Sequence, residues 1–303
     1  MNKDFLHVSD LSKDDFFNVI EKAKWIKNKF KLNDSINLMH QKTMAMIFAK
    51  PSARTRVSFE TGFFRLGGHA LYLGPNDIGI GKRESVADIA RVLSRFNDVV
   101  MARLFKHEHI LELAEHASVP VINGLTDYNH PCQIIADIFT IMEHKENINN
   151  IKISYIGDGN NIVHSWLELA MVIPINFNII CPENFKPDME LFNKVKKMNL
   201  SEVSISHNPY ESIKDSDIVY TDVWASMGQK DETDQRRKDF KDFQVNSSLM
   251  SSAGNQSLFM HCLPAERGIE VTNNVCDSNQ SIIFDQAENR MHAQNAIILH
   301  LVK

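Results

Sequence analysis

From about residue 43 onward, short apolar runs alternate with longer amphipathic stretches along the chain. Runs of this length predict buried strands, and apolar positions at helical spacing predict helices that cover a sheet. The alternation is typical of βα units around a parallel sheet. In the first half we predict strands at residues 43–49, 69–73, 98–102 and 119–122, and helices at residues 57–66, 85–96, 107–116 and 131–143.

A polar segment at residues 144–150 separates this half from a second alternation. The Lys- and Asp-rich stretch at residues 229–242 is most simply a solvated loop or helix. The sequence therefore predicts an α/β protein of two domains, residues 1–143 and 151–287, each a parallel sheet flanked by helices. In the second half the predicted strands are residues 151–156, 177–180, 203–206, 218–221 and 258–261, and the predicted helices are residues 162–173, 190–198 and 288–302.

Composition narrows the class of protein. With 303 residues, 43% of them hydrophobic and 23% charged, the chain has the profile of a folded protein, which excludes disorder and coiled coil as overall classes. The net charge is −5 without a basic tail or stripe, so we expect no nucleic acid as a partner. No apolar run approaches the roughly 18 residues of a membrane span, and the charged start MNKDF differs from a signal peptide. We therefore expect a cytoplasmic protein with no membrane partner.

The four cysteines, Cys132, Cys181, Cys262 and Cys276, form no CxxC pair and lie too far apart in sequence for a compact zinc motif. Disulfides are not expected in the cytoplasm. Small buried thiols account for most of the four. The sequence thus predicts no metal site.

The first candidate site is KPSARTR at residues 50–56, between a predicted strand and a predicted helix. The first-turn N–H groups of the helix, the positive end of its dipole and the guanidinium groups of Arg54 and Arg56 form an anion site suited to a phosphate. Ser52 and Thr55 add hydroxyl groups. A helix cap followed by exposed arginines is the alternative. The position at the carboxyl end of a strand, where α/β sheets bind ligands, favours the phosphate site.

The second candidate is DYNHPCQ at residues 127–133, again between a predicted strand and a predicted helix. His130 can donate a hydrogen bond to a carbonyl oxygen, and Gln133 offers an acceptor and two donors. A lone histidine is more often structural, but the helix start and the neighbouring Gln133 favour function. Because carboxyl ends of parallel strands meet at one edge, we expect both candidates to face one crevice.

With further motifs, these segments resemble the aspartate and ornithine carbamoyltransferase family over nearly the whole chain, and within it the members that use ornithine. SARTR alone is moderately specific, but five further motifs in the family's order leave little room for coincidence. The motifs are SARTR at residues 52–56, a lone Arg103 after a strand, HPCQ at 130–133, DVWASMG at 222–228, HCLPAERG at 261–268 and ENRMH at 288–292.

The resemblance implies two α/β domains, one for carbamoyl phosphate and one for the amine, with the C-terminal helix at residues 288–303 packing back on the N-terminal domain. It also implies a homotrimer with shared active sites at subunit boundaries, where a loop of the neighbouring subunit covers the phosphate. Here that loop is residues 81–85, and Lys82 is its candidate contact.

The resemblance assigns residues to carbamoyl phosphate. The phosphate is cradled by Ser52, Ala53, Arg54 and Thr55, and Arg103 bridges the phosphate and carbonyl oxygens. The carbamoyl group is surrounded by His130, Gln133 and Arg290. Cys262 and Leu263 are also assigned to carbamoyl phosphate, with the Leu263 carbonyl and the Cys262 thiol close to the attacking amine. The residues expected to act in catalysis are Arg54, Arg103, His130, Cys262 and Arg290.

The ornithine site is expected around DVWASMG, since the pattern DxxxSMG separates ornithine enzymes from those for aspartate or putrescine. The bare sequence agrees in polarity, because an acid in a Gly-ended loop can pair with an ammonium group while backbone N–H groups take the α-carboxylate. Met227 taken alone would be a packing residue. The resemblance assigns Asn161, Asp222, Ser226 and Met227 to ornithine.

Cys262 next to His261 suggests a nucleophilic thiol. Consecutive strand residues point in opposite directions, however, and the resemblance implies direct attack, so we expect Cys262 to position the substrate. One departure lies nearby: Glu266 stands where many relatives have histidine or arginine, which bears on affinity and not on reaction type. Two milder departures are Ala49, where relatives often have glutamate, and Ala53, where threonine is common in the family.

The implied reaction is transfer of the carbamoyl group from carbamoyl phosphate to the δ-amine of L-ornithine, giving L-citrulline and phosphate without a metal, an organic cofactor or a covalent enzyme intermediate. Three alternatives stay open. Another amine such as putrescine could be the acceptor. An NAD-dependent dehydrogenase is suggested by Gly157, Gly159 and Glu183, although Ile162 stands where the third glycine of the fingerprint belongs. A non-enzymatic binding paralogue is the third.

Overall fold

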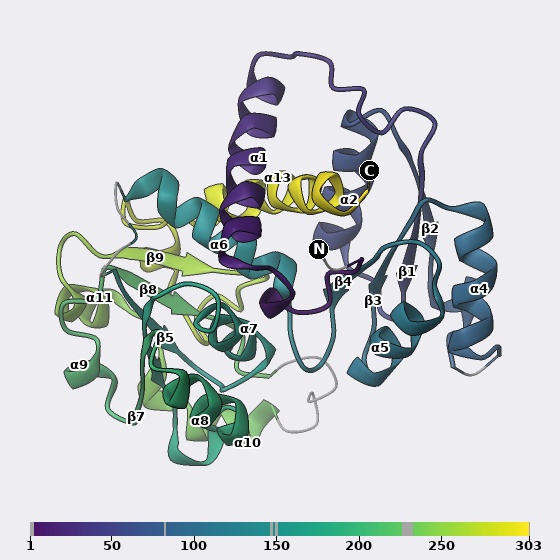
Figure 1. Cartoon of the computed structure of the whole chain (residues 1–303). Helices are drawn as coiled ribbons and strands as arrows, with labels where there is room; N and C mark the ends of the chain where they lie inside the picture. Colours follow the sequence, from purple (N-terminus) through teal and green to yellow (C-terminus); the bar gives the residue numbers. More distant parts are fainter. Residues whose placement is uncertain (1–2, 82, 146–147, 149–150, 226–232, 303) are drawn as a thin grey trace. The chain divides into compact units, whose positions relative to one another are not determined.

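The computed structural model describes residues 3–81, 83–145, 148, 151–225 and 233–302. The chain divides into two compact units, one formed by Met1–Phe139 with Glu288–Lys303 and the other by Thr140–Ala287. The divisions fall inside two helices, α6 and α13, labelled in Figure 1. Within the described residues, no helix is both long and apolar enough to cross a membrane.

The first unit is built on a four-stranded sheet in which every pair of neighbouring strands is parallel, in the order β2-β1-β3-β4. The strands are almost continuously apolar, as expected where helices cover both faces. They are β1 (Thr43–Phe48), β2 (His69–Leu73), β3 (Val99–Arg103) and β4 (Val121–Leu125). Its helices are η1 (Val8–Asp10), α1 (Lys13–Lys31), α2 (Ala53–Arg65), α3 (Pro75–Ile78), α4 (Val86–Phe96), α5 (His107–His116) and the start of α6 (Pro131–His144).

Helices α4 and α5 lie together over one face of this sheet (Figure 1). Their apolar sides, with Ile89 and Leu113 fully buried, join a cluster that includes Ile47 and Val100 of the sheet. Burial of such side chains contributes about 1.5–3 kcal/mol each. This layer leaves the carboxyl ends of the strands open to the loops that follow them.

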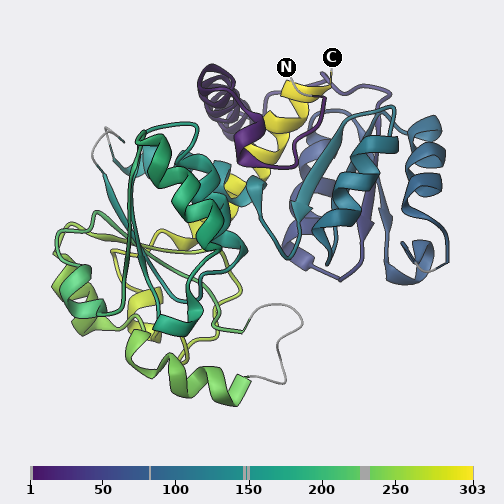
Figure 2. The ribbon, with the colours of Figure 1, turned by 60° about the horizontal axis from the view of Figure 1, so that its bottom comes forward.

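The C-terminal helix α13 (Ile283–Leu301) ends in the first unit, where it packs beside α1 and α2 (Figures 1 and 2). The Asn295 Nδ2 atom donates to the Gly62 carbonyl at 3.1 Å, and a Cβ on Gly62 would lie 2.5 Å from Asn295 Oδ1. The rings of Phe30 and His292, on α1 and α13, are 5.7 Å apart. The predicted return of the C-terminal helix to the N-terminal domain is therefore confirmed.

The second unit contains a five-stranded parallel sheet in the order β7-β6-β5-β8-β9. Trp166 of α7 stacks on Phe177 of β6 at 5.6 Å, which packs one face, and the opposite face carries a core that includes Val219, Phe240 and Phe259. The strands are β5 (Lys152–Ile156), β6 (Asn176–Ile180), β7 (Glu202–Ser206), β8 (Ile218–Thr221) and β9 (Leu258–His261). The helices are α7 (Asn161–Leu169), η2 (Glu183–Phe185), α8 (Met189–Met198), α9 (Pro209–Ser212), α10 (Thr233–Asp239), η4 (Lys241–Phe243), α11 (Ser247–Ala253) and α12 (Asn273–Cys276).

The predicted fold class, two parallel sheets flanked by helices, is confirmed, and β2, β8 and β9 have the predicted bounds. The differences lie mainly at helix ends. Helix α2 begins at Ala53 and not at residue 57, α7 ends at Leu169 and not at 173, and α13 begins at Ile283 and not at 288. Helix α1 precedes the first strand, so the alternating pattern did not indicate it. Of the stretch 229–242, residues 233–239 form α10, and residues 229–232 lie outside the described residues.

Candidate active site

The SARTR segment forms the start of α2. Ser52 is the N-cap residue, and its side chain accepts a hydrogen bond from the Thr55 backbone N–H at 3.4 Å. This cap explains why the helix begins four residues before its first apolar position. Ala53 and Arg54 occupy the first turn and are exposed, while Thr55 is fully buried. The Arg54 side chain makes no hydrogen bond or ion pair with any described residue, so its guanidinium group is available to a ligand.

The Thr55 hydroxyl is the meeting point of the first unit's predicted site. Its Oγ1 atom accepts from Arg103 Nη1 at 3.3 Å and from Arg290 Nη2 at 3.1 Å, and it lies 3.1 Å from Ser52 Oγ. Arg103 ends β3 and Arg290 lies on α13, so three distant segments converge. Two guanidinium groups sharing one buried hydroxyl at a helix N-terminus concentrate positive charge, which favours an anionic ligand.

His130 and Gln133 stand beside this cluster, at the start of α6. Burial, followed by the nearby charges of Arg290 and Arg103, holds the pKa of His130 well below its usual 6.5, so the imidazole is neutral near pH 7. The buried Gln133 donates through Nε2 to Asp137 at 2.8 Å. Its Oε1 atom is buried and has no hydrogen-bond partner among the described residues. The pair thus offers a neutral imidazole and a free amide oxygen.

Buried amides hold the loop that precedes His130. Asn123 of β4 donates to Asn129 Oδ1 at 2.6 Å, and both side-chain amides donate to the Leu6 carbonyl at 3.0 Å. Cys132 is buried among these groups, where burial raises the pKa of its thiol to about 12. Cys132 is therefore a structural thiol, as predicted from the sequence.

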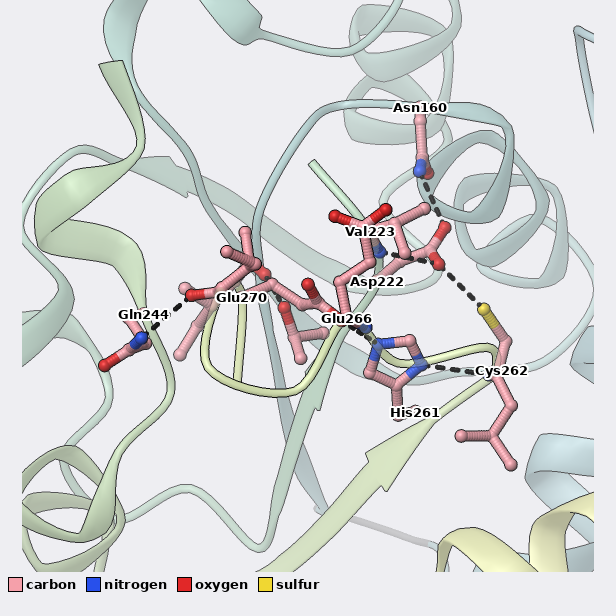
Figure 3. A network of polar contacts seen from close by, with 12 residues as sticks. Asn160, Asp222, Val223, Gln244, His261, Cys262, Glu266 and Glu270 are labelled. Atoms are coloured by element: carbon pink, nitrogen blue, oxygen red, sulfur yellow. Dashed lines mark hydrogen bonds and ion pairs between the residues drawn. The ribbon is translucent and has the colours of Figure 1, made fainter. Parts of the chain in front are cut away.

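In the second unit, the Asp222 carboxylate follows β8 and gathers three donors (Figure 3). Its Oδ1 accepts from the Val223 backbone N–H at 2.8 Å and lies 3.0 Å from Cys262 Sγ, and its Oδ2 accepts from Asn160 Nδ2 at 2.9 Å. Asp222 is only 7% exposed. A buried negative charge attracts a positively charged ligand group, such as an ammonium group, and repels an anionic one.

The side chain that contacts Asp222 is that of Asn160, which the sequence did not indicate. The predicted ornithine contact is the next residue, Asn161. Asn160 is the N-cap of α7: its Oδ1 accepts from the Ile162 N–H at 2.9 Å, which leaves its Nδ2 free to reach Asp222. Asn161 begins the helix, and its carbonyl accepts from the Ser165 hydroxyl at 2.8 Å. The NN pair at a helix start was the available signal, but only the cap geometry separates the two roles.

Cys262 and His261 point to different partners. The Cys262 thiol faces Asp222, while His261 Nδ1 accepts from the Leu263 N–H at 2.9 Å and its Nε2 lies 3.0 Å from Glu270 Oε1. His261 therefore has no nitrogen free to deprotonate Cys262. Potential ligand atoms of Asp222, His261 and Cys262 lie within 4.8 Å of one another, but the engaged imidazole makes this cluster a poor metal centre.

A buried ion pair connects the GDGNN loop with the chain after Asp222. Arg236 of α10 donates through Nη1 to Asp158 Oδ2 at 2.7 Å and to the Trp224 carbonyl at 2.9 Å. Burial raises the pKa of Asp158, and the Arg236 charge opposes that rise. The pair fixes the backbone two residues beyond Asp222. Sequence reasoning placed Arg236 in a solvated stretch and missed it.

Three predicted contacts, Lys82, Ser226 and Met227, lie outside the described residues. The structure brings together Ser52, Thr55, Arg103 and Arg290 in one cluster, with His130 close enough for its pKa to respond to both arginines. It brings Asp222 and Cys262 together in another. Glu266 is exposed, and its side chain makes no hydrogen bond or ion pair with either cluster among the described residues; its backbone N–H donates to Glu270 Oε1 at 2.6 Å.

Family models cover nearly the whole chain. Residues 3–143 match the carbamoyl-P binding domain of aspartate/ornithine carbamoyltransferase, and residues 149–301 match the Asp/Orn binding domain. The chain belongs to the aspartate/ornithine carbamoyltransferase family. The predicted family and enzyme class, a carbamoyltransferase, are thereby confirmed.

Individual relatives agree. The chain is 57% identical over 301 residues to the chloroplastic ornithine carbamoyltransferase of Pisum sativum, covering 99% of this chain and 80% of that protein. It is 46% identical to the ornithine carbamoyltransferase of Syntrophus aciditrophicus, with full coverage of both. The solved ornithine carbamoyltransferase of Pyrococcus furiosus matches with a TM-score of 0.93 at 44% identity, covering 99% of this chain and 96% of that one.

The match decides against the dehydrogenase alternative, and the structure explains the partial glycine fingerprint. A Cβ on Gly159 would lie 2.3 Å from the backbone nitrogen of Pro187. Glycine is therefore needed there because another chain segment passes close by. Gly157 has a φ of +149°, a conformation that residues with side chains rarely adopt.

Proposed function

We propose that this chain transfers the carbamoyl group of carbamoyl phosphate to the δ-amine of L-ornithine, giving L-citrulline and phosphate. The observation that carries the proposal is the convergence of Arg103 and Arg290 on the Thr55 hydroxyl at the start of α2. We assign carbamoyl phosphate to residues 1–143 with the helix at 288–303, and ornithine to residues 151–287.

The phosphate group would bind at the N-terminus of α2. We assign the phosphate to Ser52, Ala53, Arg54 and Thr55. The backbone N–H groups of Ser52, Ala53 and Arg54 and the Thr55 hydroxyl supply donors, and the exposed Arg54 side chain supplies charge. The Thr55 N–H and the Ser52 hydroxyl hold the cap of the helix that presents these donors. An arginine at the positive end of a helix dipole is unfavourable for the helix itself. A bound dianion reverses that balance, which supports a ligand-binding role for Arg54.

The carbamoyl group would lie between Arg103, His130, Gln133 and Arg290. Neutral His130 donates to the carbonyl oxygen, and the two arginines stabilise the negative charge that develops there during attack. The free Gln133 Oε1 accepts from the carbamoyl NH₂ group. The carbonyl oxygen and one of the two N–H groups of the carbamoyl group then each have a partner of the correct polarity.

Ornithine would bind through the polar groups after β8 and β9. Asp222 pairs with the α-ammonium group, Asn161, Ser226 and Met227 hold the α-carboxylate end, and Cys262 with the Leu263 carbonyl lies beside the δ-amine. The hydrogen bond from Cys262 Sγ to Asp222 supports this placement, because it aims the sulfur at the charged group that recognises the substrate.

The transfer itself is direct. The neutral δ-amine attacks the carbonyl carbon, the new C–N bond forms as the C–O bond to phosphate breaks, and the departing phosphate takes the amine proton. Enzyme groups position the reactants and stabilise charge, which suffices because well-oriented reactants gain several orders of magnitude in effective concentration. Cys262 forms no bond with the substrate: both ring nitrogens of His261 are engaged, and the carboxylate that accepts from the thiol, Asp222, is assigned to the ammonium group of ornithine. No metal or organic cofactor takes part.

We further propose a homotrimer in the cytoplasm, in which Lys82 of one subunit reaches the phosphate site of another. Two variants test this assembly: one inactivated at Lys82 and one at Arg54, each inactive alone. Hybrid trimers formed by subunit exchange should regain part of the activity, because some sites then contain both intact residues. Confirmed exchange without recovered activity would contradict shared sites.

The decisive experiment is to incubate the purified protein with carbamoyl phosphate and each of three amines, L-ornithine, putrescine and L-aspartate, and to measure carbamoylated product. Citrulline with ornithine, at a rate far above the other amines, is the expected result. An inactive protein that binds carbamoyl phosphate would instead indicate a binding paralogue. Preferred turnover of putrescine would replace the acceptor and retain the reaction class.

A further inference from the structure

His261 and Glu270 form a fully buried pair, and His261 directly precedes Cys262 in the chain (Figure 3). The proposed reaction uses neither side chain. Glu270 Oε1 accepts from His261 Nε2 at 3.0 Å and from the Glu266 backbone N–H at 2.6 Å. Both donors lie on Oε1, and the buried Oε2 atom has no hydrogen-bond partner among the described residues. Burying a carboxylate with so few donors is costly, so we expect the pair to serve a purpose that offsets this cost.

The hydrogen bonds determine the tautomer of His261. The Leu263 backbone N–H donates to Nδ1 at 2.9 Å, so Nδ1 must carry a lone pair. The proton of the neutral ring therefore lies on Nε2, where it points at Glu270. A ring with its proton on Nδ1 would face the Leu263 N–H donor to donor. Glu270 thus selects the one tautomer that can accept from Leu263.

That accepted bond holds an unfavourable backbone. Leu263 has a φ of +58°, in the left-handed region that non-glycine residues rarely occupy. Such conformations persist where neighbouring groups determine them. Because the conformation of Leu263 sets the direction of its carbonyl and of the preceding Cys262, the buried pair controls where both proposed ornithine contacts point.

Glu270 is itself anchored from outside the turn. The Val245 N–H donates to the Glu270 carbonyl at 2.8 Å, and Gln244 Nε2 donates to the carbonyls of Gly268 and Ile269 at 3.1 and 2.9 Å. The anchor lies on the segment between η4 and α11, far from Asp222 in sequence. The carboxylate therefore presents a fixed acceptor to His261.

We propose that Glu270, acting through His261, is a positioning residue that sets the Cys262–Leu263 turn for ornithine. The inference rests on the proposed function. The arrangement resembles a Cys-His-acid triad only in composition, because His261 Nδ1 accepts from Leu263 and its Nε2 donates to Glu270. Its task is geometric: it keeps Cys262 Sγ within reach of Asp222.

Two substitutions of Glu270 distinguish the effect of losing the hydrogen-bond acceptor from the effect of losing the negative charge. Glu270→Met removes the acceptor at similar size, whereas Glu270→Gln can keep an oxygen at the Oε1 position. Asp277→Asn is the matched control, since this acid at the end of α12 pairs at the surface with Arg267 and with no other side chain of the described residues. For each variant the KM of ornithine and the KM of carbamoyl phosphate are measured separately, with thermal unfolding beside them.

In Glu270→Met we expect the KM of ornithine to rise about tenfold or more and the KM of carbamoyl phosphate to rise clearly less, because most carbamoyl phosphate contacts lie in the other unit. Glu270→Gln should reverse most of the rise in the ornithine KM. Asp277→Asn should match wild type. An unchanged ornithine KM in a destabilised Glu270→Met, or equal rises in both KM values, would overturn the proposal. Wild type is measured in the same assay. If wild type forms no citrulline, the proposed function fails; if wild type is active and the variants show the contrary pattern, only the role of Glu270 fails.

A second measurement needs no folded variant. In wild-type protein labelled with ¹⁵N-histidine, the long-range ¹H–¹⁵N spectrum should show the His261 ring protonated on Nε2, with Nδ1 carrying the lone pair. A ring protonated on Nδ1 would overturn the proposal, because Leu263 would then have no acceptor.

Discussion

Arg290 Nη2 donates to Thr55 Oγ1 at 3.1 Å, although the two residues are 235 positions apart in the sequence. Arg103 Nη1 reaches the same oxygen at 3.3 Å. The hydroxyl therefore joins three segments: a helix start, a strand end and the C-terminal helix. The sequence names the residues of these segments but does not show that they contact one another. Because both guanidinium groups donate to this oxygen, a mutation that removes it should affect the positions of both arginines.

Thr55→Val keeps the shape of the side chain and removes the shared acceptor. Because the two guanidinium groups lose a buried partner, we expect the free energy of unfolding to fall by about 1–3 kcal/mol and the KM of carbamoyl phosphate to rise. Urea unfolding and steady-state kinetics measure the two effects. Thr61→Val, at an exposed threonine of the same helix, is the control and should change neither. A Thr55→Val enzyme with wild-type KM would show that the hydroxyl does not organise the phosphate site.

Arg54→Ala should separate activity from stability. The side chain is exposed and lies at the positive end of α2, so its removal should leave the unfolding midpoint unchanged or slightly raised. If it stabilises charge in the transition state, turnover should fall on the order of 100-fold or more. Citrulline formation and urea unfolding on the same preparation test both parts. Activity within about threefold of wild type would remove Arg54 from the site.

Much of the fold could be predicted because strands of a covered parallel sheet are short apolar runs, and these runs are visible in one dimension. The start of α2 was placed too late, since residues 53–56 contain no large apolar side chain and the Ser52 cap, not burial, begins the helix. Helix α1 was missed because no strand precedes it to complete the alternation. A helix end that is determined by a capping residue is harder to predict from sequence than the middle of a helix or strand, where the buried apolar residues form a visible pattern.

The candidate site divides along a similar line. Motif residues such as Thr55 and Asp222 could be named because polar groups that follow strands collect at one sheet edge. Asn160 could not be separated from Asn161, since only the cap of α7 decides which side chain reaches Asp222. Glu270 escaped notice because its link to His261 depends on the turn between them, which no local spacing indicates.

His107 should make stability depend on pH. Burial and then the nearby His7 lower the pKa of His107 to about 4, with the ring nitrogens of the two residues 3.2 Å apart. A folded pKa below the unfolded value means stability that is present above about pH 6.5 and is lost as pH falls toward 4. We expect the urea midpoint to drop between about pH 7.5 and 5.

The substitution His107→Gln should reduce this pH-dependent drop, because the variant has no imidazole to protonate at that position. His69→Gln, at an exposed histidine, is the control and should retain the wild-type dependence. An equal drop in wild type and His107→Gln would assign the pH dependence to other groups.

The pH profile of the reaction should have no contribution from His130 near neutrality. Burial, Arg290 and Arg103 hold its pKa well below 6.5, so the ring stays neutral and keeps its donor throughout the working range. The attacking amine, by contrast, starts near a pKa of about 10 and must lose a proton. Hence kcat/KM for ornithine should rise steadily from about pH 6 to about pH 9. An inflection near 6.5 that disappears in His130→Asn would contradict the neutral assignment.

The choice of amine should depend on Asp222, whose carboxylate is buried among Asn160, Val223 and Cys262. Putrescine lacks the α-carboxylate, so donors built for that group would stay unpaired at roughly 1–3 kcal/mol each, and lysine is one methylene too long. Aspartate would add a second carboxylate beside Asp222. We expect kcat/KM to fall from ornithine to lysine and putrescine far behind, with aspartate undetectable.

Asp222→Asn tests the same point from the protein side. The substitution keeps the size of the side chain but removes the charge that pairs with an ammonium group, so ornithine use should fall severely while the KM of carbamoyl phosphate changes little. Because Asn160 Nδ2 donates to Asp222 Oδ2, the variant is also read against Asn160→Ala, which should weaken ornithine binding less, since the carboxylate remains. Competition among the amines at equal concentration measures the ranking directly. Comparable turnover of putrescine and ornithine by wild type would overturn the assignment to ornithine and leave the carbamoyltransferase reaction standing.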